Sequence, residues 1–211
     1  MVLYPPDLPR EHLDYVARSA EANWTVTDDP GLEFSHCRIE RILPRRGRSR
    51  NQSLDRSQKV GTEWILLTSG TTAHPKLVRH TLASLTGAIL PRNPSSAPIV
   101  WSTLYDIRRY GGLQIFLRAA LTGTPLVLAG AHESTAEFLA RAGSRSITHI
   151  SGTPSQWRRV LMSPSVNRIA PAYVRLSGEI ADQAILNQLH SQYPEARIAH
   201  AFASTEAGGG A

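Results

Sequence analysis

A chain of 211 residues, 41% of them hydrophobic, can bury one sizeable core or form a large piece of a bigger domain. It contains no run of 18 or more apolar residues, which excludes a membrane-spanning helix by sequence, and Pro5, Pro6 and Asp7 interrupt the apolar stretch that a signal peptide would need. The single cysteine, Cys37, cannot form an internal disulfide. We therefore expect a cytoplasmic protein.

The net charge of +6 indicates an anionic partner. Lys59 and Lys76 are the only lysines among 23 basic residues, so a lysine is more informative here than an arginine. Six arginines crowd one short segment: Arg38, Arg41, Arg45, Arg46, Arg48 and Arg50. This segment has no interleaved aromatic residues and no nucleic-acid motif, so we expect an exposed Arg-rich loop over about 45–57 and no nucleic-acid partner.

The predicted elements alternate between strands and helices. Pro9 begins a helical pattern, which is followed by a strand over Trp24–Thr27, and Cys37 lies in an alternating stretch typical of another strand. Further strands are predicted at 64–67, 99–104, 126–129, 147–150, 174–176 and 198–202, and helices at 82–90, 113–121, 136–142, 156–162 and 185–193. This order predicts an α/β fold with a mainly parallel sheet flanked by helices, in which ligands bind beyond the carboxyl ends of the strands.

The segment after the strand at 64–67 has the composition that polyphosphate recognition requires. Backbone N–H groups near Gly70 can form an anion-binding concavity, and Lys76, preceded by the rigid Pro75, brings a positive charge to the β- and γ-phosphates. Four hydroxyls can donate to phosphate oxygens: Thr68, Ser69, Thr71 and Thr72. The spacing is not that of a Walker A loop, and a polar turn between a strand and a helix is the alternative interpretation.

This segment, T-S-G-T-T-A-H-P-K-L, resembles the phosphate-binding signature T-S-G-T-T-G-x-P-K-G of the adenylate-forming family, which includes acyl-CoA synthetases, adenylation domains of peptide synthetases and luciferases. Ala73 and Leu77 replace two glycines of that signature. Alanine disfavours a positive φ, so we expect ATP-like binding more firmly than ATP turnover. The resemblance covers residues 1–211 and implies a partial large domain of an adenylate-forming enzyme.

Two later segments resemble family motifs that surround the adenine and the α-phosphate. The segment R-L-S-G-E-I at 175–180 resembles G-G-E-P, which implies that the backbone of Gly178 and Glu179 lines the adenine pocket. The segment A-F-A-S-T-E-A-G at 201–208 resembles Y-G-x-T-E. The resemblance implies that Phe202 stacks on adenine, Thr205 contacts the α-phosphate and Glu206 holds Mg²⁺. Ala203 and Ser204 complete this nucleotide-binding block.

The substrate pocket is implied by softer matches. Tyr105 and Tyr110 lie where family members have an aromatic gate to the acyl pocket, although packing in the core is an equal alternative. Gly152 lies in a strand-to-helix turn that would add backbone to this pocket. Thr153, in the same turn, is predicted to be the N-cap of the following helix.

The resemblance implies that a carboxylic acid attacks ATP to give acyl-AMP and pyrophosphate, and that coenzyme A then displaces AMP. Lys76, Thr205 and Glu206 are the expected catalytic residues, with ATP and Mg²⁺ bound and an acyl-CoA synthetase of fatty acid metabolism as the expected subtype. The ribose-binding aspartate and the small C-terminal lid domain of the family do not occur in this sequence. We expect a fragment, a truncated product or half of a split enzyme that needs a separate C-terminal half to complete its cycle.

Three alternatives stay open. A free-standing amino-acid adenylation domain would need an acidic residue for the amino group of its substrate, and Asp106 is the nearby candidate. A non-catalytic remnant that binds nucleotide, or nothing, is favoured by Ala73 and Ala203. Binding of RNA or DNA through the arginines of residues 38–50 is the third.

Overall fold

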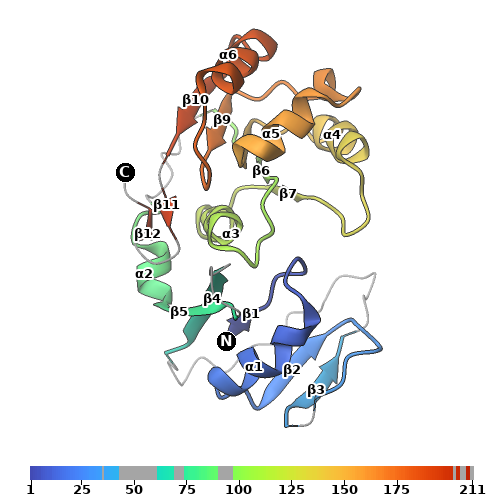
Figure 1. Ribbon diagram of the computed structural model, residues 1–211. Helices are drawn as coiled ribbons and strands as arrows, with labels where there is room; N and C mark the ends of the chain where they lie inside the picture. Colours follow the sequence, from blue (N-terminus) through green and yellow to red (C-terminus); the bar gives the residue numbers. More distant parts are fainter. Residues whose placement is uncertain are drawn as a thin grey trace. The chain divides into compact units, whose positions relative to one another are not determined.

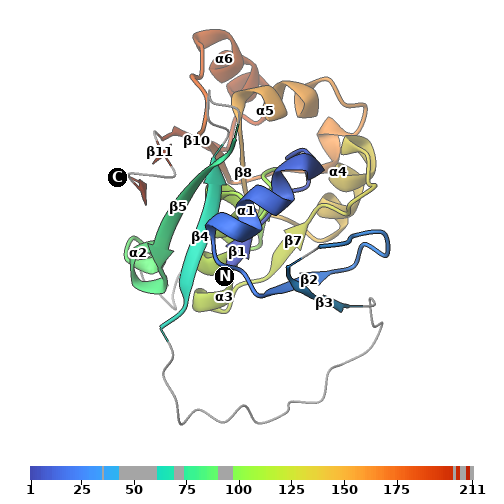
Figure 2. The same ribbon diagram turned by 60° about the horizontal axis from the view of Figure 1, so that its bottom comes forward.

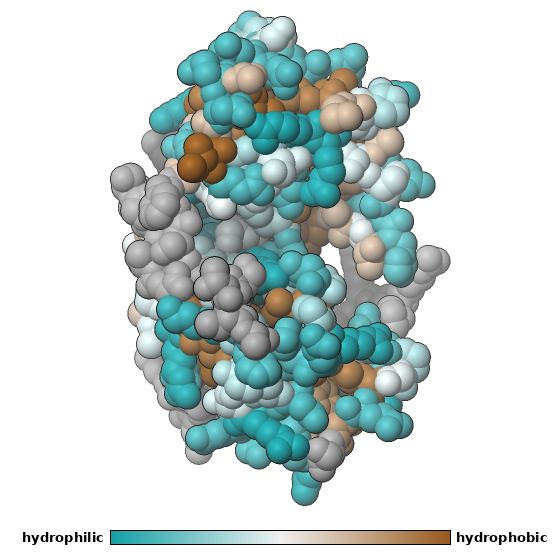
Figure 3. Space-filling model, in the orientation of Figure 1, coloured by the Kyte–Doolittle hydropathy of each residue, from teal (hydrophilic) through white to brown (hydrophobic). Residues whose placement is uncertain are grey.

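The computed structural model describes residues 1–34, 36–42, 61–68, 74–89 and 97–201, together with the backbone of 203–204 and 208–209. The described chain forms two compact units, Met1–Leu82 and Ala83–Ala211 (Figure 1). Most of the surface seen in Figure 3 is hydrophilic over both units. Among the described residues no helix combines the length and the apolar character needed to cross a bilayer.

The first unit is built on a three-stranded sheet of order β1-β4-β5. β1 (Val2–Leu3) is parallel to β4 (Glu63–Thr68), and β4 is antiparallel to β5 (Lys76–Thr81), which lies beside it in Figure 2. The short helices η1 (Arg10–His12) and α1 (Leu13–Ser19) precede a separate parallel pair, β2 (Trp24–Thr27) and β3 (Arg38–Arg41). Ile65, Leu66 and Leu67 of β4 are buried, because apolar side chains fill both faces of this central strand.

Two sequence predictions are corrected in this unit. The phosphate loop is followed by a strand and not by a helix: β5 runs antiparallel to β4. The short helix α2 (Leu82–Thr86) begins only after β5. Cys37 precedes β3 rather than lying within it, and its buried thiol lies 2.9 Å from the carbonyl oxygen of Ala22. The Arg-rich loop predicted over 45–57 lies outside the described residues.

The second unit contains the predicted parallel sheet, with strand order β10-β9-β8-β6-β7. Its strands are β6 (Trp101–Thr103), β7 (Leu126–Leu128), β8 (His149–Gly152), β9 (Tyr173–Leu176) and β10 (Arg197–His200), and all neighbours are parallel. The intervening helices are α3 (Tyr110–Thr122), α4 (Thr135–Ser144), α5 (Pro154–Leu161), η2 (Val166–Arg168) and α6 (Gln183–Gln192). A small antiparallel pair, β11 (Ala203–Ser204) and β12 (Gly208–Gly209), follows.

Helices cover both faces of this sheet (Figure 1). One face forms the main core with α4, α5 and α6, where Leu139, Ile150 and Trp157 are fully buried. The other face packs Trp101 against Ile115 and Ala119 of α3. The fold class predicted from the alternating pattern is thereby confirmed, with strand ends shifted by one or two residues.

Helix starts in this unit follow capping rules. Thr153 accepts a hydrogen bond from the backbone of Gln156 at 3.1 Å, and the side chain of Gln156 accepts one from the backbone of Thr153 at 2.8 Å. Ser134 and Glu137 form the same reciprocal arrangement at α4. The predicted role of Thr153 as an N-cap is therefore confirmed.

Candidate functional site

The predicted phosphate loop connects the two strands of a β-hairpin in the first unit. Thr68 ends β4 and Lys76 begins β5, and the two residues are direct cross-strand partners. Pro75 is buried, whereas Lys76 is exposed. The hairpin therefore fixes a hydroxyl and an ammonium group at the two ends of one loop, and Ser69, Gly70, Thr71 and Thr72 lie between them, outside the described residues.

An aromatic cluster anchors the end of this loop, and the sequence did not indicate it. The ring of His74 stacks on Tyr15 of α1, with centroids 4.2 Å apart and planes inclined by 15°. It also meets the ring of His12 edge to face at 5.6 Å. Because His74 lies two residues before Lys76, these contacts position the backbone from which the lysine projects.

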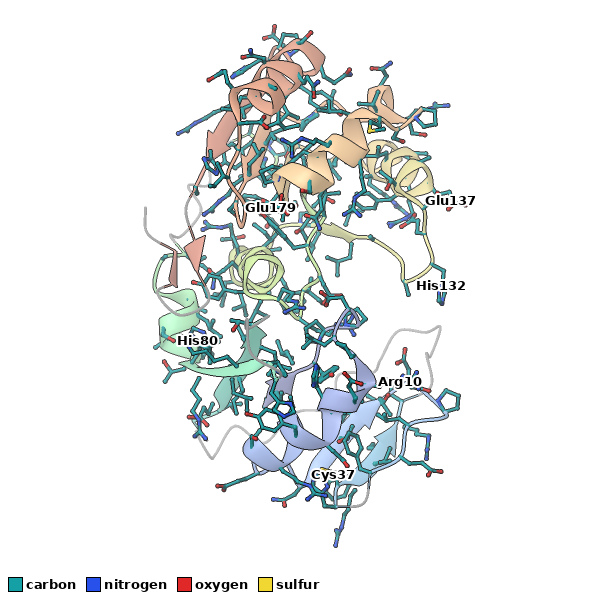
Figure 4. The ribbon with its side chains drawn as sticks, in the orientation of Figure 1. Arg10, Cys37, His80, His132, Glu137 and Glu179 are labelled. Carbon is teal, nitrogen blue, oxygen red and sulfur yellow. The ribbon has the colours of Figure 1, made fainter. Side chains whose placement is uncertain are left out.

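The second predicted nucleotide segment forms the turn after β9. Gly178 has a φ of +85°, in the left-handed region that favours glycine. This backbone conformation explains why a glycine follows Ser177. The carboxylate of Glu179, labelled in Figure 4, accepts a hydrogen bond from the backbone N–H of Ser155 at 2.9 Å. Glu179 therefore ties this turn to the first turn of α5, a structural role that the sequence did not predict.

The ionisation of Glu179 follows from these contacts. Burial opposes its negative charge, but the hydrogen bonds from Ser155 and Thr153 and the positive charge of Arg158 outweigh burial and lower its pKa. The carbonyl oxygen of Glu179 also lies 3.2 Å from Nε2 of His200, at the end of β10. The turn is thus held on two sides.

Tyr105 lies between β6 and α3, partly buried. Its hydroxyl donates to the carbonyl oxygen of Ser177 at 2.9 Å and lies 2.8 Å from the Ser177 hydroxyl, while its backbone N–H bonds to Thr103. Burial is the main reason why the pKa of Tyr105 is raised. Tyr110 is the first residue of α3 and is half-buried. Tyr105 therefore joins the gate segment directly to the predicted adenine segment.

Asp106 is already engaged by its own loop. Arg108 donates to its carboxylate through Nε at 2.8 Å and through a terminal nitrogen at 2.7 Å, and the backbone N–H of Arg108 donates as well at 2.8 Å. Burial opposes the charge of Asp106, but these contacts outweigh burial and lower its pKa. The carboxylate is therefore paired with a cation.

Two glycines permit close packing around this segment. A Cβ atom on Gly152 would lie 2.6 Å from Cδ1 of Leu104, so the predicted pocket residue leaves room for a core side chain. A Cβ atom on Gly112 would lie 2.2 Å from the carbonyl oxygen of Asp106. Gly112 therefore lets the start of α3 approach the backbone of the loop that carries Tyr105.

The structure brings part of the predicted site together. Tyr105, Gly152 and Gly178 meet at the carboxyl ends of β6, β8 and β9, where ligands bind in parallel sheets. Phe202, Thr205 and Glu206 lie outside the described residues, and only the backbone of Ala203 and Ser204 is described, in β11. In the described ranges no three His, Cys, Asp or Glu side chains cluster as metal ligands would. A hollow of about 400 Å³ beside β7, lined partly by Leu126, Arg141 and Arg145, contains none of the predicted site residues.

These features agree with a comparison of sequence families. The profile of the family described as AMP-binding enzyme matches residues 1–211, and the chain belongs to that family. No match was found among curated proteins.

Several solved structures share this fold. The N-terminal subdomain of Klebsiella oxytoca NpsA in complex with 3-hydroxybenzoyl-AMSN superimposes with a TM-score of 0.73 at 20% identity, covering 96% of this chain and 53% of that one. A luciferase-like enzyme from the nonluminescent Zophobas morio mealworm gives a TM-score of 0.71 at 14% identity, covering 98% and 54%. VinN in complex with L-aspartate gives a TM-score of 0.64 at 17% identity, covering 95% of this chain and 55% of that one. The chain thus spans about half the length of these structures.

Proposed function

We propose that this chain forms the ATP- and acid-binding part of an enzyme that activates a carboxylic acid as its acyl-adenylate and passes the acyl group to the thiol of coenzyme A. The observation that carries the proposal is the cross-strand pair of Thr68 and Lys76 at the base of the loop with the family's phosphate-binding pattern. Membership of the AMP-binding enzyme family supports it. In the second unit, the polar carboxyl ends of β6, β8 and β9 supply a place for the acid.

In this reaction a carboxylate oxygen attacks the α-phosphorus of ATP, and the bond from that phosphorus to the bridging oxygen of the β-phosphate breaks. Pyrophosphate leaves with the electron pair. The carboxylate is itself the nucleophile, so the chain needs no general base and contributes by positioning and by neutralising charge. Lys76 would stabilise the charge that accumulates on the leaving pyrophosphate, with the hydroxyl of Thr68 beside it. The thiol of coenzyme A then attacks the acyl carbon and loses its proton as AMP leaves.

Mg²⁺ supplies additional neutralisation of phosphate charge when it is bound. Glu206 is the residue that we propose holds it, because a hard cation prefers carboxylate oxygen. The α-phosphate contact of Thr205 and the adenine contact of Phe202 are proposals of the same kind. Lys76 is exposed, and its compact positive charge fits a polyphosphate ligand.

Amino-acid adenylation is the second candidate, and VinN in complex with L-aspartate favours it. Such an enzyme needs a free carboxylate for the amino group of its substrate. Asp106, the candidate for that role, is already held by three hydrogen bonds from Arg108. An amino group would have to displace a guanidinium from it, so the geometry favours an acid without an amino group.

The test of nucleotide binding is calorimetric titration of the chain with ATP and Mg²⁺. We expect Lys76→Ala to weaken binding by roughly tenfold or more, because a charged hydrogen bond to phosphate is lost. Arg79→Ala, which removes another exposed cation of β5, is the matched control and should leave the affinity unchanged. If the natural chain does not bind ATP, or if Lys76→Ala binds ATP as tightly as the natural chain does, the result would support a non-catalytic remnant instead.

The test of acid activation is exchange of labelled pyrophosphate into ATP by the full-length natural protein. Fatty, aromatic and amino acids are compared, and coenzyme A is then added to detect acyl-CoA. Exchange with acids that lack an amino group, followed by acyl-CoA formation, is the expected result. Exchange confined to amino acids would replace the proposal with amino-acid adenylation.

A further inference from the structure

One face of the parallel sheet carries a polar row beneath α3. Side chains alternate between the faces of a strand, and Ile150 and Val174 belong to the core under α4, α5 and α6. Ser151 and Arg175 therefore point to the opposite face, the one on which α3 packs (Figure 1). The register places Ser151 between Thr103 and Arg175. This row crosses the three central strands at, or one residue before, their carboxyl ends.

Two arginines bring positive charge to this face. Arg175 belongs to the polar row, and the guanidinium carbon of Arg118 on α3 lies 5.9 Å from the ring centre of Trp101, which is in β6 on the same face. Both arginines are partly buried. Burial lowers the pKa of Arg118, and the positive charge of Arg175 lowers it further. Arg175 also acts electrostatically on the hydroxyl of Tyr105.

No carboxylate of the described chain neutralises this pair. The ion pairs of the described residues join other partners, and neither Arg118 nor Arg175 takes part in them. Two like charges taken partly out of water without a counterion raise the free energy of the folded chain, so the arrangement calls for an anion.

A buried hydroxyl on the strand next to Arg175 also calls for a partner. Ser151 is only 1% exposed, and its Oγ has no hydrogen-bond partner within the described part of the chain. An unpaired buried hydroxyl costs about 1–3 kcal/mol, so such groups are normally satisfied. An anionic oxygen would accept a hydrogen bond from Ser151 and pair with the neighbouring guanidinium group at the same time.

We propose that Arg175, Arg118 and Ser151 form a subsite for a second carboxylate on the acid substrate, so that the enzyme activates a dicarboxylic acid. This inference rests on the proposed function, because it places the acid at the carboxyl ends of β6, β8 and β9. The carboxylate to be adenylated lies toward Tyr105 and the β9–α6 turn, and the second carboxylate lies on the α3 face. A simple fatty acid would leave both cations and the hydroxyl without partners.

The experiment compares two non-hydrolysable acyl-adenylate analogues that differ only in a terminal carboxylate, adipyl and hexanoyl, by calorimetry on the complete chain. We expect the adipyl analogue to bind roughly tenfold tighter or better, the value of one charge-assisted pairing. Arg175→Met should abolish this preference, Arg175→Lys should retain part of it, and Ser151→Ala should reduce it. Arg159→Met on α5, which removes an exposed arginine, is the matched control and should keep it. Equal binding of the two analogues by the natural chain, or a preference that survives Arg175→Met, overturns the proposal.

Three further titrations separate this inference from the function on which it rests. ATP, pyrophosphate and free adipate are each titrated against the natural chain and Arg175→Met, with free hexanoate as the reference for adipate. If Arg175→Met weakens ATP or pyrophosphate as strongly as the adipyl analogue, the arginines hold phosphate and the subsite is overturned. If adipate binds in an Arg175-dependent way but ATP does not bind, the subsite stands and adenylation falls. If ATP binds through Lys76 and adipate binds no better than hexanoate, adenylation stands and the subsite falls.

Discussion

The two units of the chain carry different groups of candidate site residues, on different kinds of scaffold. In the first unit, the register of the β4–β5 hairpin fixes the two ends of the phosphate loop. β4 contributes Ile65, Leu66 and Leu67 to a small core, while Trp24 of β2 is 58% exposed. The polar row of the second unit lies on a five-stranded sheet packed on both faces. A charged loop can bind the triphosphate of any nucleotide. A site that distinguishes one acid from another needs side chains whose positions are fixed by a packed sheet.

The largest effect is expected in the core of the second unit. Trp157→Ala should lower the free energy of unfolding of that unit by about 3–5 kcal/mol, because Trp157 is fully buried among α4, α5 and α6. Urea unfolding combined with hydrogen exchange of unit-specific amides measures it. Trp24→Ala, an exposed tryptophan in the first unit, should change stability by less than about 0.5 kcal/mol. Similar losses for the two variants would contradict the contrast between a packed and a shallow scaffold.

The next effect concerns two adjacent glycines of α3. Gly112→Ala should destabilise the second unit by about 1–3 kcal/mol, since its Cβ would collide with the backbone carbonyl of Asp106. Gly111→Ala places its Cβ 3.4 Å from the ring of Tyr105, an ordinary contact, and should be neutral or slightly stabilising in a helix. Thermal unfolding of the pair gives the comparison. Equal melting temperatures would show that the Asp106 loop yields freely and cannot position Tyr105.

A smaller effect is expected at the hydrogen bond between the gate and the β9–α6 turn. Tyr105→Phe removes the donor to the Ser177 carbonyl and the contact with its hydroxyl, and should cost about 1–2 kcal/mol. Tyr15→Phe keeps the ring that stacks on His74 and is the control. In the natural chain the raised pKa of Tyr105 means that the unfolded state loses its proton first, near pH 10.0. Stability should therefore fall as the pH rises above that value, and less steeply in Tyr105→Phe.

The smallest effect is expected at Glu179. Glu179→Gln weakens the acceptor for the Ser155 backbone N–H and should cost about 0.5–1 kcal/mol at neutral pH. The pKa of Glu179 is lowered from 4.5, so its contribution is present above that value and is lost as the pH falls through the folded-state pKa. Unfolding measured in steps between about pH 5 and pH 3 should show a shallower acid loss in the variant. Identical acid profiles would mean that Glu179 does not hold the turn.

The chain order of strands and helices could be predicted from the sequence because periodicity is a local property. Apolar runs and amphipathic stretches identified every strand of the parallel sheet, and the place of Thr153 before a helical pattern predicted its role as an N-cap. The phosphate-binding segment was recognisable because loops that bind phosphate need glycine, hydroxyls and a cation within a few residues of each other. These features determined the family before any tertiary contact was known.

Tertiary structure alone decided how those pieces meet. β5 was missed because pairing between strands, rather than local pattern, makes Lys76–Thr81 a strand and sets Lys76 opposite Thr68. The bond from Tyr105 to Ser177 joins residues that are 72 positions apart. Arg118 and Arg175 gave no signal among 23 basic residues, since only sheet register and the packing of α3 place them on one face of the sheet. Charge and composition belong to the sequence, but the desolvation that turns an arginine into a binding group exists only in the folded chain.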